Sequence, residues 1–231
     1  MLHIVTPLFR YELLEKVYQS IPKYDDITWH IAKTDHRDKL THEFISKDKR
    51  IKLYEIDCLD SDIVTKRNTI FSEIHDGYFY LLDDDTVLLN ELYLVYLEYS
   101  KMNFIGMIIG RSNLLKASYP VVNLQHARLD TGMVLCHHSV LREVRWAWHS
   151  TLPRDFYFWN RCFLFFGKNA TLLINRKIYY YNYNNVAYTI KKRILFFNLE
   201  LKINNSILVK IYFLLADVKI KIKNFYKLHK I

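Results

Sequence analysis

A short apolar run, Tyr78–Leu82, ends directly in three consecutive aspartates, Asp83, Asp84 and Asp85. Aromatic and aliphatic residues in a run of this length, preceded by a turn at Gly77, are typical of a strand covered on both faces of a sheet. Adjacent carboxylates repel one another, so a cluster of three is costly unless a cation lies nearby. In open α/β sheets, ligands bind just beyond the carboxyl ends of the strands. The stretch therefore predicts a central strand whose end forms a binding site.

The chemistry of the three aspartates indicates the kind of ligand. Oxygen ligands on a loop suit hard divalent ions such as Mg²⁺ or Mn²⁺, and magnesium sites commonly hold substrate phosphates as well. We therefore interpret Asp83–Asp85 as a metal and phosphate site. A second interpretation stays open: the same residues are compatible with a solvated turn that caps a helix, because Asp is favoured at helix N-termini.

Composition limits the class of protein. The 231 residues are 51% hydrophobic and 25% charged, enough for the core of one domain with an appendage, and the few glycines and prolines argue against a linker-rich chain. Three cysteines, Cys58, Cys136 and Cys162, show no CxxC spacing, which argues against a disulfide framework or zinc site and favours a reducing cytoplasm. No secretory signal and no bilayer-crossing apolar run is visible. We therefore expect a cytoplasmic protein.

The apolar periodicity on both sides of the central strand predicts alternating strands and helices. Strands are expected at 3–5, 27–32, 50–56, 78–82, 104–109 and 132–136, and helices at 13–21, 63–74 and 91–99. Such alternation implies βαβ units with right-handed crossovers. The expected fold class is therefore α/β, with a mainly parallel sheet flanked by helices.

A second group of candidate site residues lies at 154–161, where Asp155 and Arg161 flank a dense aromatic segment. Desolvation in an apolar pocket disfavours the ionised form of a carboxylate and makes it a better proton acceptor, so Asp155 is a candidate general base. The structural alternative is that Asp155, which follows Pro153, starts a helix whose aromatic residues belong to the core. From this segment alone the structural alternative is the stronger one.

Taken in order, these features resemble those of the nucleotide-sugar-dependent glycosyltransferases of the GT-A fold. The matching features are a strand ending in Thr6-Pro7, an acid at Asp35, a helix with Arg67-Asn68, the Asp83–Asp85 strand end, and the spaced set Asp155, Arg161 and Gly167. The N-terminal half is most similar to the inverting glucuronyltransferase type, and the Asp155 region to bacterial inverting transferases with a Glu-Asp loop. The resemblance implies a GT-A, Rossmann-like, mixed and mainly parallel sheet in a catalytic domain at 1–190.

The resemblance also implies how a nucleoside-diphosphate sugar would be bound. Thr6 and Pro7 would line the nucleotide pocket, and Asp35 would contact the base. Arg67 would hold the nucleotide or its diphosphate. Asp130 precedes the strand expected at 132–136, where members of the family often shape the donor-sugar or acceptor pocket.

Metal binding and catalysis fall to the aspartates in the same resemblance. Asp83 and Asp84 would contact the ribose and the metal shell, and Asp85, together with Asp83, would bind Mn²⁺ or Mg²⁺. The metal would neutralise the diphosphate leaving group. Asp155 matches the acid that, in inverting members, deprotonates the acceptor hydroxyl, with an oxocarbenium-like transition state. Retaining chemistry stays open, because the fold does not fix the outcome.

Two positions depart from the family pattern. Arg154 stands where a first acid often precedes the catalytic one. Many members supply a metal-binding histidine late in the domain, whereas residues 179–183 contain none, which leaves metal dependence open. Two other functions are also considered: a nucleotidyltransferase, against which the lack of a Gly-rich loop near residues 5–12 counts, and a non-enzymatic membrane- or polymer-binding module.

The C-terminal segment at 191–231 is basic and amphipathic. It has ten Lys and Arg residues against two acids, interleaved with Ile, Leu, Phe and Tyr. Such a helical tail is typical of a segment lying on an anionic membrane surface, although packing on the catalytic domain is an equal alternative. The nearly neutral body argues against nucleic acid. We expect an enzyme of surface-polysaccharide or glycolipid synthesis, peripheral on the inner face of the cytoplasmic membrane, with a glycan or lipid-linked acceptor.

Overall fold

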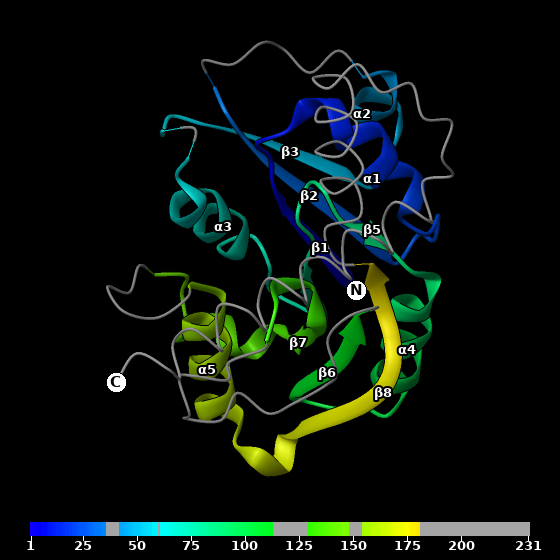
Figure 1. Ribbon diagram of the computed structural model, residues 1–231, viewed down its shortest axis with the longest axis vertical. Helices are drawn as coiled ribbons and strands as arrows, with labels where there is room; N and C mark the ends of the chain where they lie inside the picture. Colours follow the sequence, from blue (N-terminus) through cyan, green and yellow to red (C-terminus); the bar gives the residue numbers. More distant parts are fainter. Residues whose placement is uncertain (36–41, 60, 113–128, 148–153, 181–231) are drawn as a thin grey trace, which may run out of the picture. The chain divides into compact units, whose positions relative to one another are not determined.

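A computed structural model describes residues 1–35, 42–59, 61–112, 129–147 and 154–180, all within the unit Met1–Tyr181. Within these ranges the strands form one eight-stranded sheet in the order β3-β2-β1-β4-β7-β6-β8-β5 (Figure 1). The tail expected at 191–231, and with it the proposed domain boundary at 190, lies outside the described residues. No helix in the described part of the chain has the length and apolarity needed to cross a membrane.

The elements have the following bounds. The strands are β1 (Leu2–Pro7), β2 (Ile27–Thr34), β3 (Ile51–Ile56), β4 (Tyr78–Leu81), β5 (Val87–Leu88), β6 (Met107–Ser112), β7 (Val134–His137) and β8 (Thr171–Tyr180). The helices are α1 (Leu14–Ser20), α2 (Glu43–Lys47), α3 (Ile63–Phe71), α4 (Asn90–Lys101) and α5 (Arg154–Phe166), with 3₁₀ turns η1 (Tyr11–Leu13), η2 (Thr131–Met133), η3 (His138–Arg142) and η4 (Lys168–Ala170).

The N-terminal half is a parallel sheet, as the sequence predicts. Strands β3, β2, β1 and β4 are mutually parallel, so their carboxyl ends lie at one edge. β4 is fully buried and follows Gly77, whose φ of 61° is left-handed. A Cβ at this position would lie 2.0 Å from the Met1 carbonyl oxygen, so the turn requires glycine. The predicted buried strand and its turn are confirmed.

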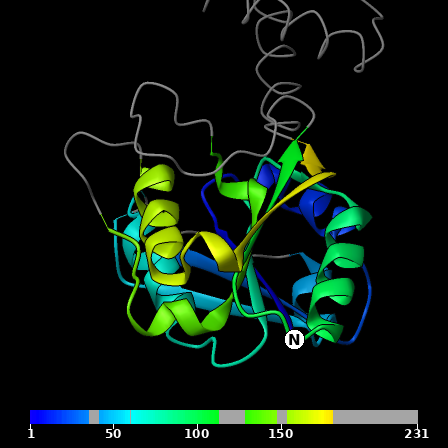
Figure 2. The same cartoon turned by 90° about the horizontal axis from the view of Figure 1, so that it is seen from below.

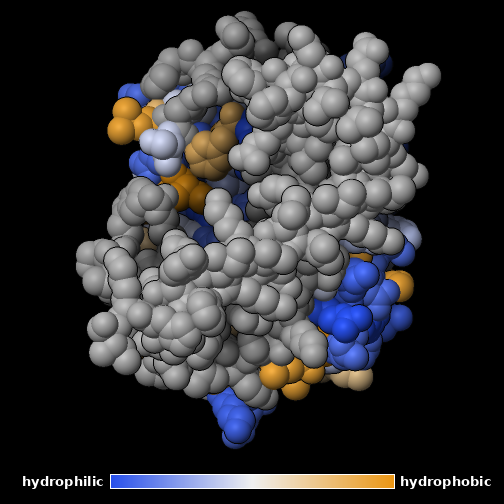
Figure 3. Space-filling model, in the orientation of Figure 1, coloured by the Kyte–Doolittle hydropathy of each residue, from blue (hydrophilic) through white to orange (hydrophobic). Residues whose placement is uncertain are grey.

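The C-terminal half makes the sheet mixed. β7 runs antiparallel to both β4 and β6, while β8 runs parallel to β6. The sequence analysis did not predict β8, β5 or α2. Polar residues interrupt the apolar pattern of β8, and Arg176 within it forms ion pairs of 2.5 Å with Glu91 and Glu98 of α4. Figure 3 shows hydrophilic side chains on this α4–β8 side. The ion pairs with α4 stabilise β8, whose own sequence pattern does not predict a strand.

Helices cover both faces of the sheet. α3 and α5 lie on one face, and α1 and α4 on the other (Figures 1 and 2). Aromatic rings join α5 to the sheet: Phe158 stacks on Phe71 of α3, and Trp159 stacks on Phe79 of β4. Both Phe158 and Trp159 are completely buried. Phe158 and Trp159 therefore belong to the core, and Asp155 lies in the first turn of the helix that they anchor.

A hydrogen-bond chain crosses the parallel strands, from Asp76 before β4 through His3 of β1 and His30 of β2 to Tyr54 of β3. His3 Nε2 lies 2.8 Å from Asp76 Oδ1, His3 Nδ1 lies 3.0 Å from His30 Nε2, and His30 Nδ1 lies 2.9 Å from the Tyr54 hydroxyl. One set of neutral tautomers satisfies every bond: Tyr54 donates to His30, His30 donates to His3, and His3 donates to Asp76. Burial lowers the pKa of His30 to about 3 and also lowers the pKa of His3.

This chain predicts a pH-dependent contribution to stability. A histidine whose folded pKa lies below its unfolded value of 6.5 stabilises the fold above pH 6.5, and this contribution is lost as the pH falls. For His30 the loss should approach about 1.4 kcal/mol per pH unit below pH 6. Denaturant titrations at pH 7.5 and pH 5 should therefore show the stability gap between wild type and His30→Gln narrowing at the lower pH. A gap that is equal at both pH values would contradict the buried neutral pair.

Candidate active site

The candidate site lies where β1, β2 and β4 end together. The register places Val5 beside Leu81 and Thr6 beside Ile31, and backbone bonds continue the pairing past the strand ends, from Leu82 to Val5 (2.9 Å) and from Leu8 to Ala32 (2.8 Å). The three aspartates therefore emerge beside the loop that follows β1. This is the edge at which α/β sheets bind ligands.

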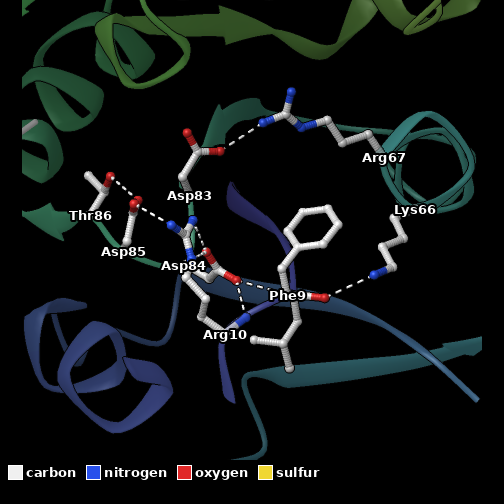
Figure 4. A network of polar contacts seen from close by, with 9 residues as sticks. Phe9, Arg10, Lys66, Arg67, Asp83, Asp84, Asp85 and Thr86 are labelled. Carbon is white, nitrogen blue, oxygen red and sulfur yellow. Dashed lines mark hydrogen bonds and ion pairs between the residues drawn. The ribbon is translucent and has the colours of Figure 1, made fainter. Parts of the chain in front are cut away.

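Asp84 is the most enclosed of the three aspartates, with 1% of its surface exposed. Its Oδ2 accepts hydrogen bonds from the backbone N–H groups of Phe9 (2.6 Å) and Arg10 (2.7 Å). Its Oδ1 accepts from Nε (2.8 Å) and Nη2 (2.5 Å) of Arg10 (Figure 4). Hydrogen bonds between an arginine and an ionised carboxylate are about twice as strong as those between neutral groups. Asp84 therefore ties the loop after β1 to the end of β4.

Asp85 shares the same guanidinium. Arg10 Nη1 donates to Asp85 Oδ2 at 2.6 Å, and the Thr86 hydroxyl donates to Asp85 Oδ1 in a long 3.4 Å bond. Burial raises the pKa of Asp85, Arg10 opposes the rise, and the carboxylate of Asp84 adds to it. The ionised form of Asp85 is therefore costly in the folded chain, and additional positive charge would stabilise it.

Asp83 points away from its two neighbours and toward Arg67 of α3, whose Nη2 donates to Asp83 Oδ1 at 2.9 Å (Figure 4). Arg67 is 1% exposed, and its guanidinium lies 3.9 Å from the centre of the Trp146 ring. Arg67 Nη1 lies 3.7 Å from Asp155 Oδ1, and among the described residues neither Nη1 nor Nε has a hydrogen-bond partner. Arg67 therefore brings together the two acidic segments that the sequence separates by seventy residues.

Asn68, next to Arg67, holds Trp146, whose ring lies against the Arg67 guanidinium. Its Nδ2 donates to the Trp146 carbonyl at 2.9 Å, and its Oδ1 accepts from the Trp146 N–H at 2.8 Å. The two bonds hold the Trp146 backbone against α3, which places the indole under the guanidinium. The Arg67-Asn68 pair thus acts as one unit.

Asp130 lies on the same side of the site. Its Oδ2 accepts a 2.5 Å hydrogen bond from the Tyr179 hydroxyl, and burial raises the pKa of Asp130 to about 6, with Asp155 contributing to the rise. Burial, together with the carboxylates of Asp155 and Asp130, also raises the pKa of Asp83, while Arg67 opposes this rise. Asp83 and Asp130 thus lie close enough to Asp155 for its charge to raise the pKa of both.

Basic side chains surround the other side of the edge. Lys66 of α3 is completely buried, donates to the Leu8 carbonyl at 2.9 Å, and lies 4.2 Å from the centre of the Phe9 ring (Figure 4). Lys33, near the end of β2, is 1% exposed and pairs with Glu55 at 2.9 Å. With Arg10 and Arg67, these side chains give the edge several fixed cations, which suits an anionic ligand such as a diphosphate.

The other predicted nucleotide contacts lie nearby but differ in exposure. Thr6 and Pro7 are buried in β1, and the Thr6 hydroxyl accepts a 2.9 Å bond from Trp29 Nε1. Asp35 is exposed, directly after β2. Sequence reasoning missed Arg10 and gave Lys66 no role. A usable signal was the charge of three adjacent aspartates, which requires compensating cations on a neighbouring loop.

The residues present can accommodate a divalent ion in one particular way. Among the described residues, no group of three or more His, Cys, Asp or Glu side chains is arranged to hold a metal. Asp83 and Asp85 each keep one oxygen that no arginine contacts. Magnesium sites commonly use one or two carboxylates and complete their shell with water and substrate phosphates. The ligand types suit such a shared site, in which Asp83 and Asp85 stay the predicted protein ligands, although their side chains face different arginines in this structure.

Comparison with known proteins identifies the fold. No protein-family model matches the sequence, and no curated protein matches it significantly. Among solved structures, residues 1–349 of S. aureus TarS align with a TM-score of 0.61 and 12% identity over 90% of this chain and 68% of that one. The same fragment with UDP-GlcNAc aligns with a TM-score of 0.59 and 10% identity, covering 90% and 69%. A longer TarS structure is covered to 41%.

A second protein gives the same result. The mannosyltransferase PcManGT from Pyrobaculum calidifontis, in complex with GDP-Man and Mn²⁺, aligns with a TM-score of 0.59 and 11% identity, covering 90% of this chain and 72% of that one. Both TarS and PcManGT are GT-A type glycosyltransferases. The mixed, mainly parallel sheet flanked by helices is thus a GT-A fold, as the sequence analysis predicts.

Proposed function

We propose that this protein is a nucleotide-sugar-dependent glycosyltransferase that transfers a sugar to a hydroxyl group of a glycan or lipid-linked acceptor. The observation that carries the proposal is the convergence of Asp83, Arg67 and Asp155 at the carboxyl edge of a GT-A sheet. The complexes of similar structures with UDP-GlcNAc and with GDP-Man and Mn²⁺ support a nucleotide-sugar donor.

Both basic and acidic side chains are proposed to bind the donor. Lys66 and the backbone of Arg10 are held at the edge where the diphosphate would lie, and within the described part of the chain Nε and Nη1 of Arg67 have no hydrogen-bond partner. Asp83 and Asp85 would hold Mn²⁺ or Mg²⁺, whose chemistry when bound is to neutralise charge on the leaving diphosphate. Thr6, Pro7 and Asp35 are proposed to border the nucleoside, with Asp84 holding the loop and Asp130 facing the donor sugar or the acceptor.

Asp155 is proposed to accept the proton of the attacking acceptor hydroxyl, which would give inversion at the anomeric carbon. Its side chain is 36% exposed, so an acceptor from solution can reach it, and its position at the start of α5 is rigid because that helix is anchored in the core. Arg67, 3.7 Å away, would orient the carboxylate between the donor site and solvent.

A thermal-shift titration tests the proposal. Saturation at about one hundred times the dissociation constant should stabilise the fold by roughly 2.7 kcal/mol. We expect a shift with one nucleoside diphosphate that increases with Mn²⁺, and we expect Asp85→Asn to remove the Mn²⁺-dependent part. Asp48→Asn is the matched control, because Asp48 pairs with Arg50 in a similar fork at the opposite edge of the sheet. Absence of any nucleotide-dependent shift would favour a non-enzymatic binding module instead.

The tail at 191–231 is proposed to bring the catalytic domain to an anionic membrane surface, on the basis of its excess of basic residues. Sedimentation of the full chain with vesicles containing phosphatidylglycerol should depend on salt. Replacing Lys219, Lys221 and Lys223 by Glu should reduce the bound fraction severalfold, since each basic residue near such a surface contributes about 1 kcal/mol. Equal binding of both chains would argue that the tail packs on protein.

A further inference from the structure

One arginine, Arg10, occupies Asp85, one of the two carboxylates that are predicted to bind a divalent ion. The Arg10 guanidinium binds Asp84 through Nε and Nη2 and Asp85 through Nη1, so a single positive charge is shared by two buried carboxylates. A cation brought to Asp85 while Arg10 remains in place would meet a like charge within a few ångströms, which opposes its binding. Arg10 and a metal ion therefore compete for Asp85.

The guanidinium can leave without disturbing the loop that carries it. The backbone N–H groups of Phe9 and Arg10 both donate to Asp84 Oδ2, so the loop after β1 is held by main-chain bonds. The Arg10 side chain is 34% exposed, in contrast to the 0% and 4% exposure of the Asp84 and Asp85 side chains. The carboxylates are thus fixed, and the cation that covers them has access to solvent and to an incoming ligand.

We infer that Arg10 is an exchangeable counter-cation that covers Asp85 in the free protein and moves to the diphosphate of the donor when it binds. This inference rests on the proposed function. The planar fork of arginine matches phosphate oxygens as well as carboxylate oxygens. A diphosphate that draws Arg10 away exposes Asp85 to the divalent ion, so metal and nucleotide favour each other's binding by the same factor. Arg10 is in this sense a positioning residue that sets the order of assembly.

The Mn²⁺ affinity of the free protein tests this role directly. Binding is followed by loss of the electron paramagnetic resonance signal of free Mn²⁺, for wild type, Arg10→Gln and Arg10→Lys, first with Mn²⁺ alone and then with UDP or GDP as probes. Without nucleotide, Arg10→Gln should bind Mn²⁺ at least about tenfold more tightly than wild type, because one nearby charge is removed. Arg10→Lys keeps that charge and should lie closer to wild type.

Nucleotide should change the difference in Mn²⁺ affinity between wild type and Arg10→Gln. In wild type the nucleoside diphosphate should raise the Mn²⁺ affinity at least about tenfold, and in Arg10→Gln the rise should be smaller, because the competing cation is already absent. Arg50→Gln, which removes a similar arginine–aspartate fork at the opposite edge of the sheet, should leave Mn²⁺ binding unchanged and reports the stability cost of such a loss.

The outcomes distinguish failure of the proposed role of Arg10 from failure of the proposed function. Equal Mn²⁺ affinities of wild type and both Arg10 variants without nucleotide would overturn the role of Arg10, even if nucleotide binds. If neither probe nucleotide nor any other nucleoside diphosphate binds wild type, the proposed function fails, while the comparison with Mn²⁺ alone still decides whether Arg10 blocks the metal. If Arg10→Gln does not fold, the same comparison is made with Arg10→Met, which also removes the charge; a tighter Mn²⁺ affinity than wild type supports the inference and an equal one overturns it.

Discussion

Replacing Asp155 by Asn is expected to lower kcat by about 10²–10⁴-fold while the protein stays folded and still binds its donor nucleotide. The amide keeps the size of the side chain but cannot accept the proton of the acceptor hydroxyl. Asp155 lies in the first turn of α5, so the loss of its charge should cost only about 0.3–1 kcal/mol of stability. Sugar transfer is measured by release of nucleoside diphosphate, and the stereochemistry of the product shows whether the anomeric centre inverts.

Asp62→Asn provides the matched control for Asp155. Asp62 caps α3, and its Oδ1 accepts from the Thr65 N–H at 3.0 Å, so it also supplies a negative charge at a helix N-terminus. Its replacement should leave kcat nearly unchanged. A variant Asp155→Asn that transfers sugar at close to the wild-type rate would exclude Asp155 as the base and would direct attention to Asp130, the other acid on that side of the site.

The second large effect is expected at Asp84, and it concerns stability. Asp84→Asn should destabilise the fold by about 2–4 kcal/mol, because the amide nitrogen would face donor groups of Arg10 and leave a charged group without its partner. This expected loss of stability does not exceed the loss for a fully buried ion pair, because the Arg10 side chain is 34% exposed. Denaturant titration measures the loss.

Asp85→Asn should behave differently although it lies next in the chain. Burial raises the pKa of Asp85, so its ionised form is disfavoured in the folded state, and a neutral amide should be close to neutral or slightly stabilising. The contrast between the two variants distinguishes a structural aspartate from one whose charge is kept for a ligand. Equal losses for both variants would contradict the assignment.

The sequence was informative wherever a local pattern decides the structure. The apolar run before Asp83 predicted β4, and the alternating periodicities predicted β1, β2, β3, α1, α3 and α4, with ends shifted by a few residues. The sequence was uninformative where contacts with residues distant in the chain decide the structure of a segment. β8 contains Asn175, Arg176 and Lys177 in succession, and it holds its place through β6 and the acids of α4 rather than through its own pattern.

The candidate site shows the same division. The acids were visible in the sequence because three adjacent aspartates are unusual, and Arg67 was visible through a family resemblance. The partners of each acid were not visible. That Asp84 is saturated by the loop after β1, whereas Asp83 turns to Arg67, depends on which way each carboxylate leaves the end of β4. No spacing in the sequence encodes that choice.

The bond between Arg10 and Asp84 has a consequence for the order in which the protein is made. Its two partners are 74 residues apart in the chain, and both have been synthesised before α5 begins. Because synthesis starts at the N-terminus, both partners of this arginine–aspartate clasp exist before Asp155 is added to the chain. Asp155, the other partner of Arg67, is synthesised later as part of α5. A chain that stops before α5 would thus contain both partners of the Arg10–Asp84 clasp but would lack Asp155, the proposed acceptor-activating group.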